Sequence, residues 1–173
     1  MVAWGVSDLS KKWQYRKEIL FVSFVLSILC LSIITWTQVG YWQNSITLYD
    51  HTLKVTDYNC VIYNNRGIAY SALGNYGQAI DDCSRAIEID PGFAGAYYNR
   101  GNAYNGLSNH RQAIEDYSKA IEIRPGYADA YNNRGYSYLL QGNKEIGCRD
   151  AQRACELGTC KSLEFAKGKG LCR

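Results

Sequence analysis

The sequence predicts an all-α protein, a solenoid of tandem helical hairpins behind one transmembrane helix. Three observations lead to this prediction. A five-residue motif recurs with one constant period, small and apolar residues follow it at helical spacing, and residues 19–36 contain no charge. Self-similarity at a fixed period of this length is typical of stacked helical hairpins, whereas a long uncharged apolar run is typical of a membrane-spanning helix.

The recurring motif is Tyr-x-Asn-Arg-Gly, which begins at residues 63, 97 and 131. Its glycine allows the two helices of a hairpin to approach closely, and the alanines at 79 and 113 are small for the same reason. Turns are marked by Gly74-Asn75, Ser108-Asn109 and Gly142-Asn143. Pro91 and Pro125 end second helices. The predicted segments are a degenerate half-repeat at 40–59, repeats at 60–93, 94–127 and 128–161, and a cysteine-containing cap at 162–173.

The half-repeat is predicted from the same register. Ser45, Tyr49, Thr52 and Asp57 lie one period before Ala79, Cys83, Ala86 and Pro91, which are the landmarks of a second helix. The first helix of this repeat would then be the apolar segment itself.

These landmarks resemble those of the tetratricopeptide repeat. The match is complete in 94–127, with Tyr97, Gly101, Tyr104, Ala113, Tyr117, Ala120 and Pro125. The last repeat departs from it at Gly147, Ala151 and Thr159, as is common where a solenoid ends. The resemblance implies about three hairpins whose first helices line a concave groove, and a partner that is a protein or an extended peptide.

One polar position recurs in that groove, at Asn65, Asn99 and Asn133. The row is similar to the asparagine ladder of O-linked N-acetylglucosamine transferase repeats, which grips peptide backbone. An amide offers both a donor and an acceptor, and so matches a peptide group whatever the side chain. The alternative is that these residues only solvate a polar face. The predicted neighbours in the groove are Tyr98, Asn102, Asn132 and Tyr136.

Three arginines, Arg66, Arg100 and Arg134, recur beside the asparagines. We expect them to make contacts between repeats rather than to clamp a ligand. The carboxylate clamp of this family is not matched, because one of its basic positions is occupied by Val61, Gly95 and Asp129.

Residues 19–39 are predicted to form a transmembrane helix, with a secretory signal peptide as the alternative. The apolar run is longer than the core of a usual signal, and no small-residue cleavage site follows it. Basic residues at 11, 12, 16 and 17 precede the run, whereas the next one after it is Lys54. The positive-inside rule therefore places residues 1–18 in the cytoplasm and the repeats on the periplasmic or luminal side.

Four of the seven cysteines lie close to the C-terminus, at Cys148, Cys155, Cys160 and Cys172. An exported domain would favour disulfides. Cys148 and Cys155 are predicted to lie on one helix with Cα atoms about 10 Å apart, too far for a bridge. We favour Cys155–Cys160 with Cys148–Cys172; a zinc site and free thiols are the alternatives.

Composition and motifs indicate a binding protein rather than an enzyme. The formal charge of +3 does not suggest a nucleic-acid partner. The sequence shows no phosphate loop, nucleophile elbow or metal-spaced acid cluster, so we expect no catalytic residues, cofactor or metal. The pairs Asp81-Asp82 and Glu115-Asp116 are interpreted as an outer helix face.

The leading functional prediction is a membrane-anchored adaptor or scaffold that binds a protein or peptide in its groove. The alternative is the non-catalytic tail of a larger, glycosyltransferase-like membrane enzyme, which recruits the substrate. Residues 41–55 together with the repeats resemble the C-terminal tails of multi-pass membrane proteins that end in such repeats. A purely structural role in a larger complex is a third possibility.

Overall fold

The computed structural model describes residues 20–37, 45–56 and 58–172. It divides into two units, one that ends at Asn44 and one that begins at Ser45. Each is described here by itself. The expectations for residues 1–19 and 38–44, which include the cytoplasmic segment and both ends of the predicted span, lie outside the described residues.

The apolar segment forms one helix, Leu20–Thr37, with a mean hydropathy of 2.2 and no buried residue. By length and composition this helix could cross a membrane, and an N-terminal signal sequence would meet the same criterion. Its five hydroxyl groups donate to backbone carbonyl oxygens three or four residues earlier, at 2.7–2.9 Å. The helix therefore satisfies its own hydroxyl donors without water, as suits a hydrocarbon environment.

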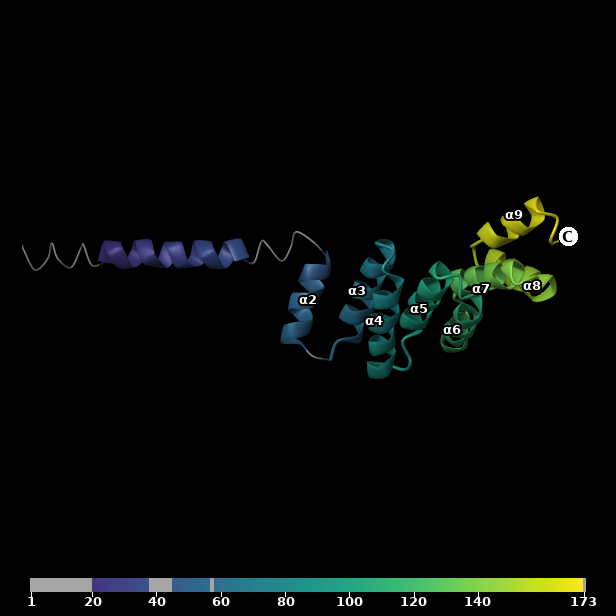
Figure 1. Ribbon diagram of the computed structural model, residues 1–173, viewed down its shortest axis with the longest axis horizontal. Coiled ribbons are helices and arrows are strands. Elements are labelled where there is room, and N and C mark those ends of the chain that lie inside the picture. The colour runs from purple at the N-terminus through teal and green to yellow at the C-terminus, as the bar shows by residue number, and fades with distance from the viewer. Residues whose placement is uncertain (1–19, 38–44, 57, 173) are drawn as a thin grey trace, which may run out of the picture. The chain divides into compact units, whose positions relative to one another are not determined.

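The second unit is a row of helices, most of which pack on their neighbours in sequence (Figure 1). Three hairpins join α3 to α4, α5 to α6 and α7 to α8, while α2 precedes them and α9 follows. The part of the chain that the structure describes contains no strand, and the all-α prediction is confirmed. The helices are α2 (Ser45–Val55), α3 (Cys60–Ala72), α4 (Tyr76–Ile89), α5 (Ala94–Gly106), α6 (His110–Ile123), α7 (Ala128–Leu140), α8 (Lys144–Glu156) and α9 (Lys161–Gly168).

Small residues let each hairpin close. A Cβ atom on Gly101 would lie 2.7 Å from the ring of Tyr117, and one on Gly67 would lie 2.9 Å from Sγ of Cys83. Real Cβ atoms do not approach other atoms so closely, so glycine is required at both positions. The alanines of the second helices are fully buried in the same interfaces, at 79, 86, 113 and 120.

The third hairpin reaches the same packing with different residues. Gly147 stands where the first two hairpins have alanine, and a Cβ atom there would lie 2.7 Å from Cγ of Leu139. Leu139 is only 6% exposed and replaces the polar Ser71 and Asn105 of the earlier repeats. The departure from the family pattern at Gly147 is thus compensated by Leu139 within a repacked hairpin.

Both ends of the second unit are single helices. Asp50 of α2 and Ser84 of α4 occupy equivalent repeat positions, and each accepts a hydrogen bond from the arginine of the following first helix. This places α2 in the register of a second helix. Its pairing with the apolar segment as a first helix stays a prediction. At the other end, α9 packs on α7 and α8.

Candidate binding groove along the first helices

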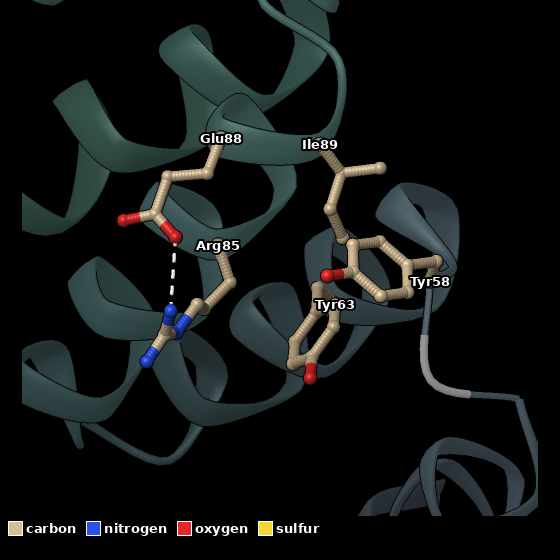
Figure 2. Close-up of a pocket in the computed structure, with 5 residues that line it drawn as sticks. All are labelled: Tyr58, Tyr63, Arg85, Glu88 and Ile89. Atoms are coloured by element: carbon tan, nitrogen blue, oxygen red, sulfur yellow. Dashed lines mark hydrogen bonds and ion pairs between the residues drawn. The ribbon is translucent and has the colours of Figure 1, made fainter.

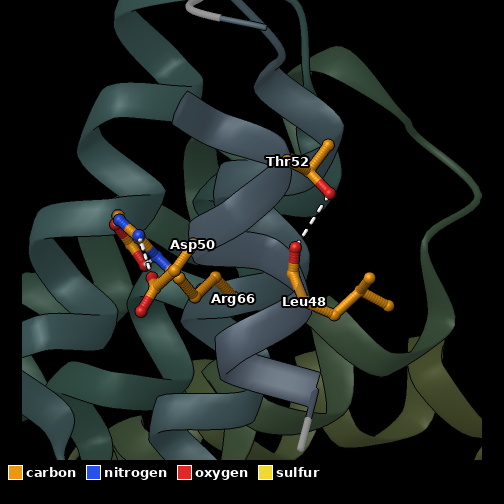
Figure 3. A network of polar contacts seen from close by, with 5 residues as sticks. Leu48, Asp50, Thr52 and Arg66 are labelled. Atoms are coloured by element: carbon orange, nitrogen blue, oxygen red, sulfur yellow. Dashed lines mark hydrogen bonds and ion pairs between the residues drawn. The ribbon is translucent and has the colours of Figure 1, made fainter. Parts of the chain in front are cut away.

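Each arginine of the repeated motif binds one aspartate through two nitrogen atoms and joins two repeats through a third. The paired N–O distances are 2.6–2.9 Å. The remaining nitrogen reaches an oxygen of the preceding second helix at 2.6–3.0 Å, as Figure 3 shows for Arg66 and Asp50. These contacts, which we call the arginine ladder, join Asp50–Arg66–Asp82, Ser84–Arg100–Asp116 and Ser118–Arg134–Asp150. The arginines therefore connect repeats, as expected from the sequence.

The prediction that the acidic pairs form an outer helix face is wrong for the aspartates of the arginine ladder. Asp82 and Asp116 do not lie on an outer face, because they are 5% and 6% exposed; only their neighbours Asp81 and Glu115 are exposed. Adjacent residues of a helix point in different directions, so one acid of each pair enters the hairpin. A buried carboxylate is tolerated when it is paired. The hydrogen bonds that Arg66 donates to Asp82 in turn raise the pKa of Arg66, against the opposing effect of burial.

A row of side-chain amides follows the arginine ladder along the first helices. Asn99 of α5 donates from Nδ2 to Oδ1 of Asn64 on α3 at 2.9 Å, and Asn64 contacts Asn65 at 3.5 Å. Asn64 is buried, whereas Asn65 and Asn99 are half-buried. Within the described residues, Nδ2 of Asn65 and Oδ1 of Asn99 have no hydrogen-bond partner. This part of the row keeps a donor and an acceptor open.

Asn133, at the equivalent position of α7, lies in a closed network. Its Nδ2 donates to Oδ1 of Asn102 at 2.8 Å and to the Tyr98 hydroxyl at 3.2 Å. Its Oδ1 accepts from Asn132 at 3.1 Å. The Tyr117 hydroxyl also donates to Oδ1 of Asn102, at 2.8 Å. The structure thus brings four of the predicted groove residues together, but in bonds with one another.

Two members of this network, Asn105 and Tyr117, were not among the predicted groove residues. Nδ2 of Asn105 donates to the Tyr117 hydroxyl at 3.1 Å, and its Oδ1 accepts from Ser137 at 3.0 Å and contacts Nδ1 of His110 at 2.8 Å. Burial raises the pKa of Tyr117, so its hydroxyl stays protonated and able to donate. A signal for Asn105 exists in the sequence, because it lies three residues after Asn102 and therefore on the same helix face.

Helix α9 covers the α7 end of the row. The backbone N–H of Ser162 donates to Oδ1 of Asn132 at 2.8 Å, and Asn132 is buried. Tyr136 packs edge-on against Phe165 of α9, with ring centroids 5.2 Å apart. The cap therefore shields Asn132 and covers part of Tyr136, and the open section of the row lies on α3 and α5.

The four C-terminal cysteines lie in two pairs. Cys148 and Cys172 have Cα atoms 5.6 Å apart, and Cys155 and Cys160 have Cα atoms 4.1 Å apart. This is the pairing favoured from the sequence, while bridge formation in the protein stays a prediction. Both pairs connect α8 to the segment that contains α9. No group of three or more His, Cys, Asp or Glu suited to a metal ion occurs among the described residues.

A separate surface pocket of about 450 Å³ lies beside the start of α3. It is lined by Tyr58, Tyr63, Arg85, Glu88 and Ile89 (Figure 2). Arg85 and Glu88 form an ion pair at 3.0 Å with both side chains more than half exposed. A similar exposed pair, Lys119–Glu122, occupies the same positions of the next repeat. The pocket contains none of the predicted groove residues.

Comparison with known protein families identifies the family of these repeats. One family model described as tetratricopeptide repeat matches residues 61–93 and 94–127, and another model with the same description matches residues 117–148. Together the matches span just over half of the chain. The chain therefore belongs to the tetratricopeptide repeat family.

Individual relatives share the repeats. Outer envelope protein 64, chloroplastic, from Arabidopsis thaliana is 44% identical over 45 residues, which are 26% of this chain and 8% of that protein. The chain thus spans less than a tenth of that relative. The crystal structure of MamA aligns with a TM-score of 0.63 and 28% identity over 78% of this chain and 75% of MamA. The first such domain of Spaghetti (RPAP3), bound to the HSP90 peptide SRMEEVD, shares the fold, with a TM-score of 0.61 and 24% identity over 63% and 88% of the two chains.

Proposed function

We propose that this chain is a membrane-anchored interaction module that holds a protein or an extended peptide along its first helices. The observation that carries the proposal is the row of side-chain amides on α3 and α5, which keeps a donor on Asn65 and an acceptor on Asn99 open. Such groups match the peptide backbone of a segment of any sequence. The HSP90 peptide bound to RPAP3 is an example of this kind of partner in that protein.

The proposed anchor is the helix Leu20–Thr37, with the repeats on the extracytoplasmic side. The high hydropathy of this helix and its internally bonded hydroxyl groups support the anchor. The basic residues before it support the orientation. The paired cysteines agree with it, because disulfides persist in oxidising compartments.

Binding suits the groove better than catalysis does. The buried carboxylates of Asp82, Asp116 and Asp150 are paired with arginines and are therefore not available as acids or bases. We expect the module to be non-catalytic. The alternative role as the tail of a larger enzyme is supported only by the sequence of residues 41–55 together with the repeats.

The proposal is tested by photo-crosslinking from two positions of the full chain in its native membrane. A crosslinking residue replaces Ile68, which lies on α3 and is 45% exposed, or Glu115, which is exposed on the second helix α6. We expect a defined protein adduct from position 68, identified by mass spectrometry, and none from position 115. Equal adducts from both positions, or none from either, would rule out the groove as the binding surface.

A further inference from the structure

We infer that the ligand segment binds only at the α3–α5 end of the groove, and that it is an extended segment with apolar side chains and no acidic groups. This inference rests on the proposed function, because it states where in the groove the segment lies and what its chemistry is.

The charge of the first helices excludes an acidic ligand. The sequences of α3, α5 and α7 contain four charged residues, namely Arg66, Arg100, Arg134 and Asp129. All three arginines are held by aspartates in the arginine ladder. The first helices therefore offer no free positive charge. A carboxylate entering the groove would lose water and meet a neutral amide donor such as Nδ2 of Asn65, but no cationic partner.

Apolar side chains flank the open amides at one end only. Val61, Asn65 and Ile68 are spaced so that they share one face of α3, and Val61 and Ile68 are 50% and 45% exposed. The side chains of an extended segment alternate between its two sides. Its backbone can therefore bond to Asn65 while its apolar side chains cover Val61 and Ile68. The same positions are Gly95 and Asn102 in α5, so no second aliphatic pair follows.

The α7 end of the row is already occupied. Both hydrogens of Nδ2 of Asn133 are used, for Asn102 and Tyr98, and its oxygen accepts from Asn132. Asn132 itself bonds to the backbone of α9. The three recurring asparagines thus have two roles, with Asn65 and Asn99 free to bind a ligand and Asn133 holding helices together.

The chemistry of the ligand is tested with fluorescein-labelled heptapeptides and the full chain in lipid nanodiscs. Two pools of fixed composition are compared by fluorescence polarisation: a neutral, amidated pool rich in Val, Ile and Leu, and an acidic pool. The peptide SRMEEVD, which binds RPAP3, is the reference acidic probe. We expect the neutral pool to bind and the acidic probes to bind at least about tenfold more weakly. Preferred binding of the acidic probes would overturn this inference and leave the proposed function standing. Absence of binding by either pool would overturn both the inference and the proposed function.

The location is tested with single substitutions and the neutral pool. Asn65→Ala and Asn99→Ala should each weaken binding by about fivefold, the effect of one neutral hydrogen bond. Asn133→Ala should lower the melting temperature and leave binding unchanged when measured well below it. The matched control is Asn75→Ala, an exposed residue with no side-chain cap bond in the turn after α3. Loss of binding in folded Asn133→Ala equal to that in Asn65→Ala would overturn the inference.

Discussion

Single buried charges decide much of the stability of the repeats. Asp116 is held by two bonds from Arg100 and is nearly inaccessible, with its side chain 8% exposed. Asp116→Ala leaves the guanidinium without its main partner, so we expect the free energy of unfolding to fall by about 3 kcal/mol. Urea titration measures this loss. The matched control, Glu115→Ala at the exposed neighbouring position, should change it by less than about 0.5 kcal/mol; similar losses in both variants would contradict the role of the ladder.

Cys83 makes stability depend on pH in the alkaline range. Burial raises the pKa of its thiol from 9.0 to about 12. Above pH 9.0 the thiol therefore ionises in the unfolded chain but not in the native one. The free energy of unfolding should fall by about 1.4 kcal/mol per pH unit from this group between these two values.

The matched comparison is Cys83→Ala. Its free energy of unfolding, measured from denaturation curves between about pH 8.5 and 10.5, should fall less steeply with pH than that of the unchanged chain. Iodoacetamide should also modify the half-buried Cys60 before Cys83 in the native chain, because only Cys83 is fully buried. Modification of both at equal rates would show that Cys83 is accessible.

Identical residues at identical repeat positions have different surroundings, and this limits prediction from the sequence. Asn99 and Asn133 share a position, so the sequence predicts one role for both. Oδ1 of Asn133 accepts from Asn132, its neighbour in the chain. The residue that stands in the same relation to Asn99 is Tyr98, which carries no amide. The row of asparagines was therefore predictable, but which of their groups stay open depends on neighbouring side chains that differ between repeats.

The turns within the hairpins also affect the free energy of unfolding. In each hairpin, the residue after the C-cap of the first helix has a left-handed backbone conformation. These residues are Gly74 at φ 78°, Ser108 at φ 58° and Gly142 at φ 82°. This conformation is strained for residues other than glycine. Ser108→Gly should therefore raise the free energy of unfolding by up to about 1 kcal/mol, and Gly142→Ala should lower it by about 1 kcal/mol. Calorimetry would refute the strain argument if Ser108→Gly lowered the melting temperature.

We expect the stability of the cap α9 to depend on bridges between the paired cysteines. If Cys148–Cys172 and Cys155–Cys160 are bridged, non-reducing peptide mapping will recover both links. The variant Cys148→Ser/Cys172→Ser should lose about 3 kcal/mol of stability. Hydrogen exchange should accelerate in α9 and remain unchanged in α3 and α4. Recovery of four free thiols from protein isolated with alkylating agent would contradict the bridges and the oxidising compartment.

The hairpins could be predicted as elements because their turn residues, glycines and prolines recur in phase. The packing inside the third hairpin could not be predicted. Compared with the alanine of the other repeats, Gly147 lacks a methyl group that would pack in the hairpin. The side chain of Leu139 fills this space, but the two residues lie on different helices that meet only in the folded chain. The buried Asp82 and Asp116 were misplaced for the same reason, since the sequence pattern does not show which side of an acidic pair faces the hairpin partner.

For the whole molecule, the central expectation is that the helix Leu20–Thr37 remains in the mature chain as an anchor. The full chain should stay in the membrane pellet after alkaline carbonate extraction, and its intact mass should include residues 1–19. A variant with Leu26→Lys and Leu29→Lys should move to the supernatant, because each lysine at the centre of a span costs about 3 kcal/mol. A mature chain that begins after this helix would identify it as a signal peptide.

The arginine ladder also shows how such an array can change in length over evolution. Each arginine uses an acceptor on the second helix before it and a carboxylate on the second helix after it, at the same sequence separation in both directions. A gene duplication that inserted one whole repeat in register would therefore bring every connection it needs to both neighbours. Helix α9 does not carry this connection, because the next arginine position is Gly168. Growth of the array by duplication is thus open within the row of repeats.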